Sequence, residues 1–207
     1  MSRRRRALLF ALFAVAALAA RAAVSPRLAP DDPAPPPLRP GEEALTLLGP
    51  FKALAANLAF VELDEAYDRG DYAAVLPLAD TITALHPQHE RVWAFAAWTL
   101  AVQIPGFEEG LPQDELWAWR KAGLLKLREG AARNPASWYL RFEEGFLACR
   151  YVAGRPALER RFRDDREVNP EGLTAADYAT RRFREAAARG PHPPYVDEYA
   201  ARGCEAP

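Results

Sequence analysis

The sequence has little of what defines several common functional classes. Its 207 residues include 2 Cys and 3 His, and 27 Lys and Arg balance 28 Asp and Glu to a net charge of -1. Two cysteines are too few for a disulfide-rich scaffold or a four-thiolate zinc site. Because no excess of positive charge is present to attract phosphates, we expect no nucleic-acid partner.

The sequence patterns of catalysis are missing as well. The chain contains neither a G-x-S-x-G nucleophile motif nor a glycine-rich phosphate-binding loop. Its one concentration of metal-capable side chains runs from His86 to Glu90, but Pro87 separates His86 from His89, so the two histidines need not share a helix face. The acidic pairs Glu108-Glu109 and Glu143-Glu144 have the usual form of a solvated face. We predict a protein that is not an enzyme, with no catalytic, cofactor-binding or metal-binding residues.

The N-terminus has the charge pattern of a membrane-targeting segment. Four arginines, Arg3 to Arg6, precede an apolar run over residues 7–24 in which Arg21 is the one charged residue. This layout is typical of a secretory signal, and the run is marginally long enough to span a membrane. In both cases the arginines stay in the cytoplasm. We predict that residues 1–24 anchor the chain in a bacterial inner membrane with the remainder outside the cytoplasm. The alternative is a cleaved signal and a periplasmic protein.

Residues 25–47 are predicted to be a linker. Seven of the chain's 19 prolines lie between Pro26 and Pro40. Proline fixes φ and removes a hydrogen-bond donor, which favours an extended spacer reaching roughly 45 Å. The folded domain is therefore expected over residues 48–207.

Within residues 48–207 the apolar residues recur with a helical period, without β-like alternation, so the predicted class is all-α. In the first helix, we expect an apolar stripe to face the core. Its members are Phe51, Leu54, Ala55, Leu58 and Val61. The residues from Arg69 to Asp71 are predicted to end this helix and cap the next. Further helices are expected over residues 72–85, 91–103, 114–129 (capped by Asp114 and closed by Gly130), 138–152, 174–189 (opened by a capping box at Thr174) and 194–202.

Three copies of a four-residue pattern lie within these predicted helices. Each copy has the spacing 4, 3 and 5, and each ends on a proline: Val75, Ala79, Ile82 and Pro87; Gly123, Leu127, Gly130 and Pro135; Ala179, Phe183, Ala186 and Pro191. Small residues at such positions allow two helices to approach closely, and the larger residue fills the groove between them.

This pattern resembles the second helix of the tetratricopeptide repeat. Trp93 and Ala97 resemble the aromatic and small positions of the repeat's first helix, and Gly145 takes the small position after Pro135. The terminal prolines lie 48 and 56 residues apart, instead of about 34, so we expect extra segments near residues 104–113 and 154–172. The resemblance implies about three degenerate helical hairpins, with insertions, behind an N-terminal hydrophobic helix.

A narrower resemblance covers residues 48–152. The stretch from Leu48 to Leu54, the Trp-x-x-x-Ala-Trp stretch ending at Trp98, and the Asn134-Pro135 helix start are similar to those of an uncharacterised family of bacterial tetratricopeptide-like proteins with an N-terminal membrane segment. The resemblance implies membrane association and provides no catalytic residues.

Four of the five tryptophans form two close pairs along the chain. Trp93 and Trp98 project about 140° apart on a helix, and Trp117 and Trp119 about 160° apart, so both members of a pair can hardly face one core. We predict that Trp93 and Trp117 lie in the core, while Trp98 and Trp119 face either a neighbouring helix or a partner.

The two cysteines leave one question open. Cys149 shares an apolar stripe with Phe142 and Phe146, which predicts a buried structural thiol. It could pair with Cys204 in an oxidising compartment, but the sequence does not establish their distance.

Together these features predict a non-enzymatic, membrane-tethered module that binds another protein of the membrane or cell envelope. Trp98 and Trp119 are its candidate partner-binding residues, and no cofactor is expected. The alternative is a structural accessory subunit of a membrane or envelope complex.

Overall fold

A computed structural model describes residues 49–107 and 110–206. The chain divides into two units, Met1–Pro36 and Pro37–Pro207. Every described residue belongs to the second unit. The predicted anchor (residues 1–24) and linker (residues 25–47) lie outside the described residues. Within the described ranges, no helix combines the length and the apolar character needed to cross a membrane.

The described residues are predominantly helical and include no β-strand, which confirms the all-α class. The elements in chain order are the 3-10 turn η2 (Gly49–Phe51), α3 (Lys52–Asp68), α4 (Tyr72–Leu85), α5 (Glu90–Trp98), the π-helical turn η3 (Thr99–Gln103), α6 (Ile104–Phe107), α7 (Gln113–Arg133), α8 (Trp138–Tyr151), α9 (Pro156–Asp164), α10 (Ala175–Ala187), α11 (Pro194–Arg202) and the 3-10 turn η4 (Gly203–Glu205).

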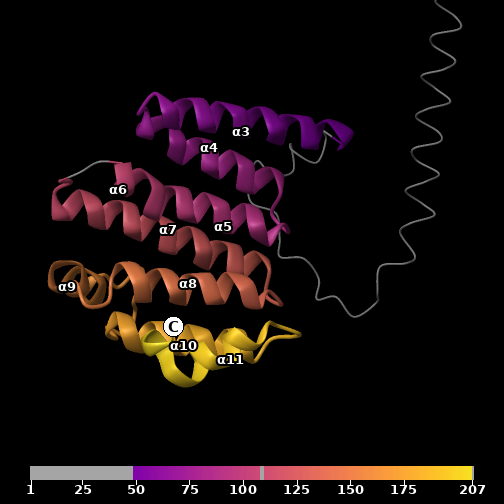
Figure 1. The fold of residues 1–207 in the computed structure, drawn as a ribbon. Coiled ribbons are helices and arrows are strands. Elements are labelled where there is room, and N and C mark those ends of the chain that lie inside the picture. The colour runs from indigo at the N-terminus through magenta and orange to yellow at the C-terminus, as the bar shows by residue number, and fades with distance from the viewer. Residues whose placement is uncertain (1–48, 108–109, 207) are drawn as a thin grey trace, which may run out of the picture. The chain divides into compact units, whose positions relative to one another are not determined.

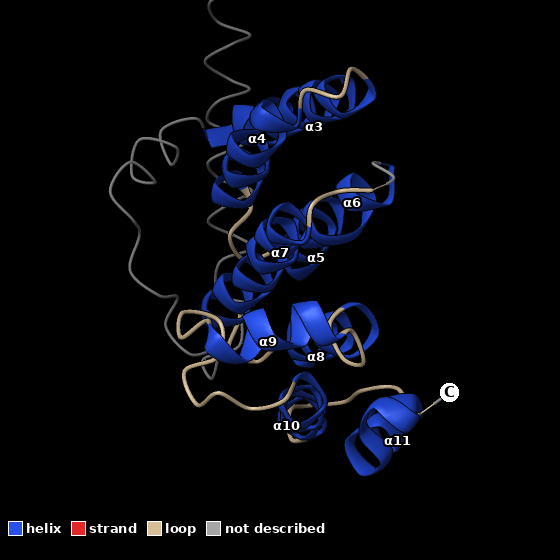
Figure 2. Ribbon diagram, turned by 90° about the vertical axis from the view of Figure 1, so that its left-hand side faces the viewer, coloured by secondary structure: helices blue, strands red, loops and turns tan. Residues whose placement is uncertain are grey.

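The helices stack in chain order, from α3 at one end of the second unit to α11 at the other (Figure 1). They form two layers: α3, α5, α8 and α11 make the first layer, and α4, α7 and α10 make the second (Figure 2). The main packing contacts join α3 to α4, α5 to α7, α7 to α8, α8 to α10 and α10 to α11. The core therefore runs between the two layers along the stack.

Local signals place most of the helix ends where the sequence predicts them. Gly70 adopts a φ of 70°, and the Asp71 side chain caps α4 by accepting a hydrogen bond from the Ala74 backbone nitrogen at 3.3 Å. Thr174 caps α10 in the same way, accepting from the Asp177 nitrogen at 3.1 Å. These two predicted turns are confirmed.

The predicted limits of α7 are wrong. This helix begins at Gln113, after Pro112, and continues past Gly130 to Arg133. Gly130 does not end the helix because it has a packing role: a Cβ at this position would lie 2.7 Å from the Cβ of Trp93. Glycine here allows close contact with α5 instead of reversing the chain.

Two further glycines make similarly close helix contacts. A Cβ at Gly123 would lie 2.5 Å from the Ala101 Cβ and 2.7 Å from the Ala97 carbonyl oxygen. A Cβ at Gly145 would lie 2.9 Å from the Phe183 ring. Helix pairs therefore approach at these points more closely than any side chain would permit.

The remaining positions of the repeated pattern are either apolar core residues or prolines in turns. The apolar ones are buried: Val75, Ala79, Ile82, Trp93, Ala97, Leu127, Ala179, Phe183 and Ala186. The three prolines lie in the turns that follow α4, α7 and α10, where Pro87 is partly buried and Pro135 and Pro191 are exposed.

The predicted core stripe of the first helix is wrong. α3 buries Ala56, Ala59, Leu63 and Ala66, whereas Phe51, Leu54, Leu58 and Val61 are exposed and Ala55 is only partly buried. The helix has two apolar faces, and the alanine-rich one lies against α4 because its small side chains allow close packing. The larger residues are left on the outside.

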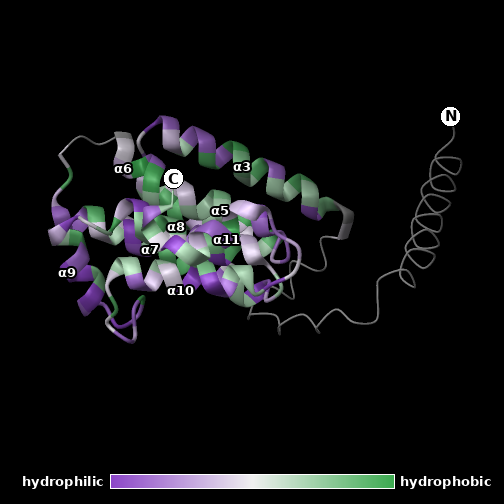
Figure 3. Cartoon of the chain, turned by 60° about the horizontal axis from the view of Figure 1, so that its bottom comes forward, coloured by the Kyte–Doolittle hydropathy of each residue, from purple (hydrophilic) through white to green (hydrophobic). Residues whose placement is uncertain are grey.

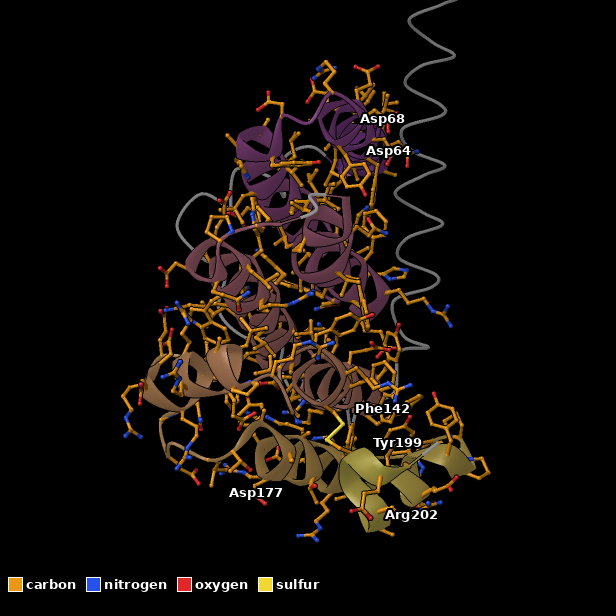
Figure 4. All side chains as sticks on the ribbon, turned by 60° about the vertical axis from the view of Figure 1, so that its left-hand side comes forward. Asp64, Asp68, Phe142, Asp177, Tyr199 and Arg202 are labelled. Atoms are coloured by element: carbon orange, nitrogen blue, oxygen red, sulfur yellow. A yellow bond between two sulfur atoms is a disulfide. The ribbon has the colours of Figure 1, made fainter. Side chains whose placement is uncertain are left out.

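The C-terminal end of the stack is closed by a disulfide bond and an aromatic cluster. Cys149 on α8 is bonded to Cys204 in η4, which answers the question left open by the sequence (Figure 4). Next to the disulfide, the Tyr199 ring packs 5.2 Å from Phe142 and 5.0 Å from Phe183, measured between centroids. These contacts hold α8, α10 and α11 together.

Candidate partner-binding site

The structure separates the four paired tryptophans as follows. Trp93 and Trp117 are buried, and Trp98 and Trp119 are partly exposed. Trp119 packs near α4, with its ring 6.3 Å from that of Tyr72. Trp98 packs instead against α8. The two candidate residues thus both contact a neighbouring helix, and they belong to different clusters.

Trp98 is linked to a partly buried carboxylate. Its Nε1 donates a hydrogen bond to Oε2 of Glu143 at 2.6 Å, and Tyr139 donates a second hydrogen bond to the same side chain. Burial raises the pKa of Glu143, and the two hydrogen bonds oppose this shift because they stabilise the ionised form. In turn, burial and the nearby negative charge of Glu143 raise the pKa of Tyr139 to about 12.

Aromatic rings surround Glu143 on three helices of the first layer. Trp98 comes from α5, Tyr139 and Phe146 come from α8, and Tyr195 comes from α11. The Trp98 and Phe146 rings lie 6.1 Å apart, and the negative charge of Glu143 reaches Tyr195, whose pKa is raised by burial and by that charge. We call these five residues the aromatic surface. None of its side chains is fully buried, and Tyr195 is exposed.

The acidic pair at residues 143 and 144 is not a solvated face, so that prediction is wrong. Glu143 is partly buried and Glu144 is fully buried. Glu144 accepts a hydrogen bond from Tyr178 and lies 3.2 Å from Nε of Arg182. Burial raises its pKa, against the lowering effect of Arg182. The other acidic pair, Glu108-Glu109, lies outside the described residues.

We interpret the Glu144 cluster as a structural link between α8 and α10. Arg182 also binds Glu185 at 2.8 Å, so both charges of the buried ion pair have further partners. The neighbouring cavity has a volume of about 80 Å³, well below the size of typical ligand pockets. The sequence contained a signal for this burial, because Glu144 lies one turn from Leu140 and from Ala148 on the same helix face.

The histidine-containing segment joins two turns of the stack. The carbonyl oxygen of Pro87 accepts hydrogen bonds from Trp93 Nε1 at 2.9 Å and from Asn134 Nδ2 at 3.0 Å. His86 and His89 lie nearby with ring centroids 6.4 Å apart. In the parts of the chain that the structure describes, no group of three or more His, Cys, Asp and Glu side chains is placed to hold a metal ion.

One buried cation borders the aromatic surface. The guanidinium of Arg120 on α7 lies 4.7 Å from the centroid of the Tyr151 ring, and that ring lies 5.6 Å from Trp98. The Nε and Nη1 atoms of Arg120 are buried and have no hydrogen-bond partner among the described residues. Burial, together with the positive charge of Arg155, lowers the pKa of Arg120 to about 10.

An open cleft of about 420 Å³ lies between α3 and α4, away from the aromatic surface. Its lining mixes charged, polar and apolar side chains: Glu62, Glu65, Ala66, Arg69, Ala74, Pro77, Leu78 and Thr81. Of the charged residues, Arg69 and Glu65 pair with each other at 3.5 Å and are both largely exposed. The cleft therefore lacks the converging, desolvated polar groups that distinguish a small-molecule site.

No protein family, curated protein or solved structure matches the chain.

Proposed function

We propose that this protein is a non-enzymatic interaction module, tethered to a bacterial inner membrane through residues 7–24, whose aromatic surface binds a segment of another membrane or envelope protein. The observation that carries the proposal is the placement of Glu143 between Trp98, Tyr139 and Tyr195 on three successive helices of one layer. Tryptophan and tyrosine are enriched at the centres of protein interfaces because they bury large areas at low entropic cost.

The chemistry of the surface suggests what a partner segment would present. A carboxylate whose solvation is already reduced gains more than an exposed one from a cation placed nearby. Aromatic rings attract the same cations through their faces. We infer that the partner contributes a Lys or Arg side chain, with apolar residues packing beside it on Phe146 and Tyr195.

The proposed location outside the cytoplasm has two supports. The arginine cluster before the apolar run predicts this orientation. The Cys149–Cys204 disulfide is typical of proteins in oxidising compartments. We also propose, from the repeated pattern, that the domain is related to tetratricopeptide repeats. Stacked helices of that kind act as interaction surfaces.

Affinity purification of the full-length protein from its native membrane, followed by mass spectrometry, tests this function. We expect one or more envelope proteins to copurify with the wild type, and Trp98→Phe or Glu143→Gln to reduce their recovery at least five-fold. Trp119→Phe is the matched control, because Trp119 lies in a different cluster. Recovery of the bait alone in several detergents, or equal recovery with all variants, would refute the aromatic surface as a binding site.

The alternative function is a structural subunit held in an envelope complex by a broad apolar face. It is favoured by the exposed apolar side chains of α3, since large apolar patches mark interaction surfaces. In that case recovery of the partner would fall with Leu58→Glu and would not change with Trp98→Phe. The same purification therefore separates the two functions.

A further inference from the structure

The α3 helix presents a line of exposed apolar side chains at the end of the stack. Leu54, Leu58 and Val61 of α3 are 56%, 60% and 56% exposed, and Phe51, the last residue of η2 directly before α3, is 65% exposed. Their spacing of 3, 4 and 3 residues keeps them on one helix face, which is separate from the alanine face that packs on α4. Figure 3 shows hydrophobic segments alternating with hydrophilic ones along α3. We call these four residues the α3 stripe.

The α3 stripe is unlike the outer surface of a finished stack. Terminal helices of stacked-helix proteins are normally polar on the outside, because no further helix covers them. The α11 helix at the other end exposes the charged residues Asp197, Glu198 and Arg202, and Tyr195 is its one exposed large apolar side chain. The stripe instead exposes on the order of 400 Å² of apolar surface, a size at which patches on monomers are often functional.

We propose that the α3 stripe is the contact through which two copies of this chain pair, with their α3 helices antiparallel. The 3-4-3 spacing is that of the a and d positions in paired helices. The stripe is also symmetric about a point between Leu54 and Leu58. A two-fold axis through this point places Leu54 of one copy against Leu58 of the other, and Phe51 against Val61, so the surface is complementary to itself.

The charges on α3 favour the antiparallel arrangement. Its exposed acidic residues, Glu62, Asp64, Glu65 and Asp68, all lie in the C-terminal half, and Figure 4 shows Asp64 and Asp68 at that end. Lys52, at the other end, is the only Lys or Arg in the helix. About the axis between Leu54 and Leu58, antiparallel pairing places Glu62 of each copy level with residue 50 of the other, close to Lys52 and the positive N-terminal end of that helix. Parallel pairing would place the two acidic ends together.

The same acidic end favours a second copy over a lipid surface as the occupant of the stripe. Anionic headgroups attract basic segments and repel acidic ones, and the stripe runs directly into Glu62 and Glu65. A protein partner with a positive helix end does not have this conflict, and the second copy supplies one.

The size of the contact indicates a weak pair in dilute solution. About 400 Å² per copy is half of the roughly 800 Å² that each partner of a typical stable complex buries. We expect a dissociation constant on the order of 10 μM or weaker for the full-length protein in detergent. Confinement of both copies to one membrane would raise their effective concentration and the paired fraction.

Cysteine cross-linking of the full-length protein tests the geometry. Phe51→Cys and Val61→Cys chains, carrying different tags, are mixed and oxidised, and the native cysteines remain bonded to each other. Antiparallel pairing predicts mixed cross-links at least ten-fold above same-position ones. Two copies of residue 51 would then lie about 15 Å apart along the helix, too far for a disulfide. Same-position cross-links in excess, or none at all, would overturn the proposed arrangement.

Sedimentation velocity of the same protein tests the contact itself. Leu58→Glu is expected to weaken association at least ten-fold, and the control Leu76→Glu, on an exposed apolar residue of α4, to change it less than two-fold. Association unaffected by Leu58→Glu would overturn the proposal. A protein that is monomeric at all concentrations would also overturn it. In that case, a Phe51→Cys thiol shielded from reagents would show that the stripe is covered by its own chain or by detergent. Trp98→Phe should leave association unchanged, so this test is independent of the proposed partner site.

Discussion

Replacing Gly123 by alanine should destabilise the domain, although alanine is the better helix former. In a helix interior, Gly→Ala normally raises the free energy of unfolding by about 1 kcal/mol. At Gly123 the new Cβ would lie 2.5 Å from the Ala101 Cβ and 2.7 Å from the Ala97 carbonyl oxygen, where ordinary contact begins at 3.4 Å. Both atoms belong to the neighbouring helical segment, so relief requires separating α7 from it.

The size of the effect follows from these opposing contributions. Overpacking a dense core costs about 1–3 kcal/mol, and two contacts with atoms close to or on the backbone place Gly123 at or above the upper end. After subtraction of the propensity gain, we expect Gly123→Ala to lower the free energy of unfolding by about 2 kcal/mol. For a domain of this size that corresponds to a loss of about 4–8 °C in Tm.

Guanidinium unfolding followed by far-UV circular dichroism measures this difference on the full-length protein. Gly106→Ala is the matched control, because a Cβ there meets nothing within 4 Å, and it should leave stability unchanged or raise it slightly. Adding Ala101→Gly to Gly123→Ala removes the closest contact, so the double variant should lose less than the sum of the single variants. If Gly123→Ala proves as harmless as Gly106→Ala, the close approach of α7 to its neighbour is refuted.

Three other perturbations have definite expected outcomes. Removing the disulfide with Cys149→Ala and Cys204→Ala should lower the unfolding free energy by about 4 kcal/mol, because the bonded positions are 55 residues apart. A reductant should destabilise the wild type and leave the variant unchanged. Equal sensitivity of the two proteins to the reductant would contradict this. Because Glu143 has a raised pKa, the wild type should gain stability relative to Glu143→Gln as pH falls toward 4.5; a pH-independent difference in unfolding curves counts against burial of this carboxylate. Arg120→Met should maintain or raise the unfolding free energy, by up to about 3 kcal/mol, and a clear loss in calorimetry would show that the contact with the Tyr151 ring outweighs the cost of burying the guanidinium.

Features set by neighbouring residues could be predicted from the sequence. The Gly70-Asp71 turn and the Thr174 capping box depend on hydrogen bonds within four residues, so their residue types identify them directly. The buried small and large residues around Ala79 and Phe183 were predictable for a similar reason, since their spacing on one helix places them on one face.

Features that depend on distant contacts could not be predicted in this way. α3 has two apolar faces, and the choice of the alanine face depends on the shape of α4. Gly130 has the residue type of a helix end, and only its contact with Trp93 shows that it is a packing residue. The hydrogen bond from Trp98 to Glu143 joins residues 45 positions apart. The sequence pattern therefore indicates Trp98 as a candidate binding residue but predicts a solvated Glu143. Periodicity alone could have shown the burial of Glu144.

The single disulfide makes the two ends of the domain differ in their resistance to a pulling force. It encloses residues 149–204 in a covalent loop, so a pulling force cannot extend that end of the chain. No such bond holds α3 and α4. If the chain is pulled through the residues that precede Gly49, the load reaches α3 first and can peel the helices off in sequence until it meets α8. The helices before α8 would then unfold stepwise under tension, while the disulfide keeps residues 149 and 204 from separating.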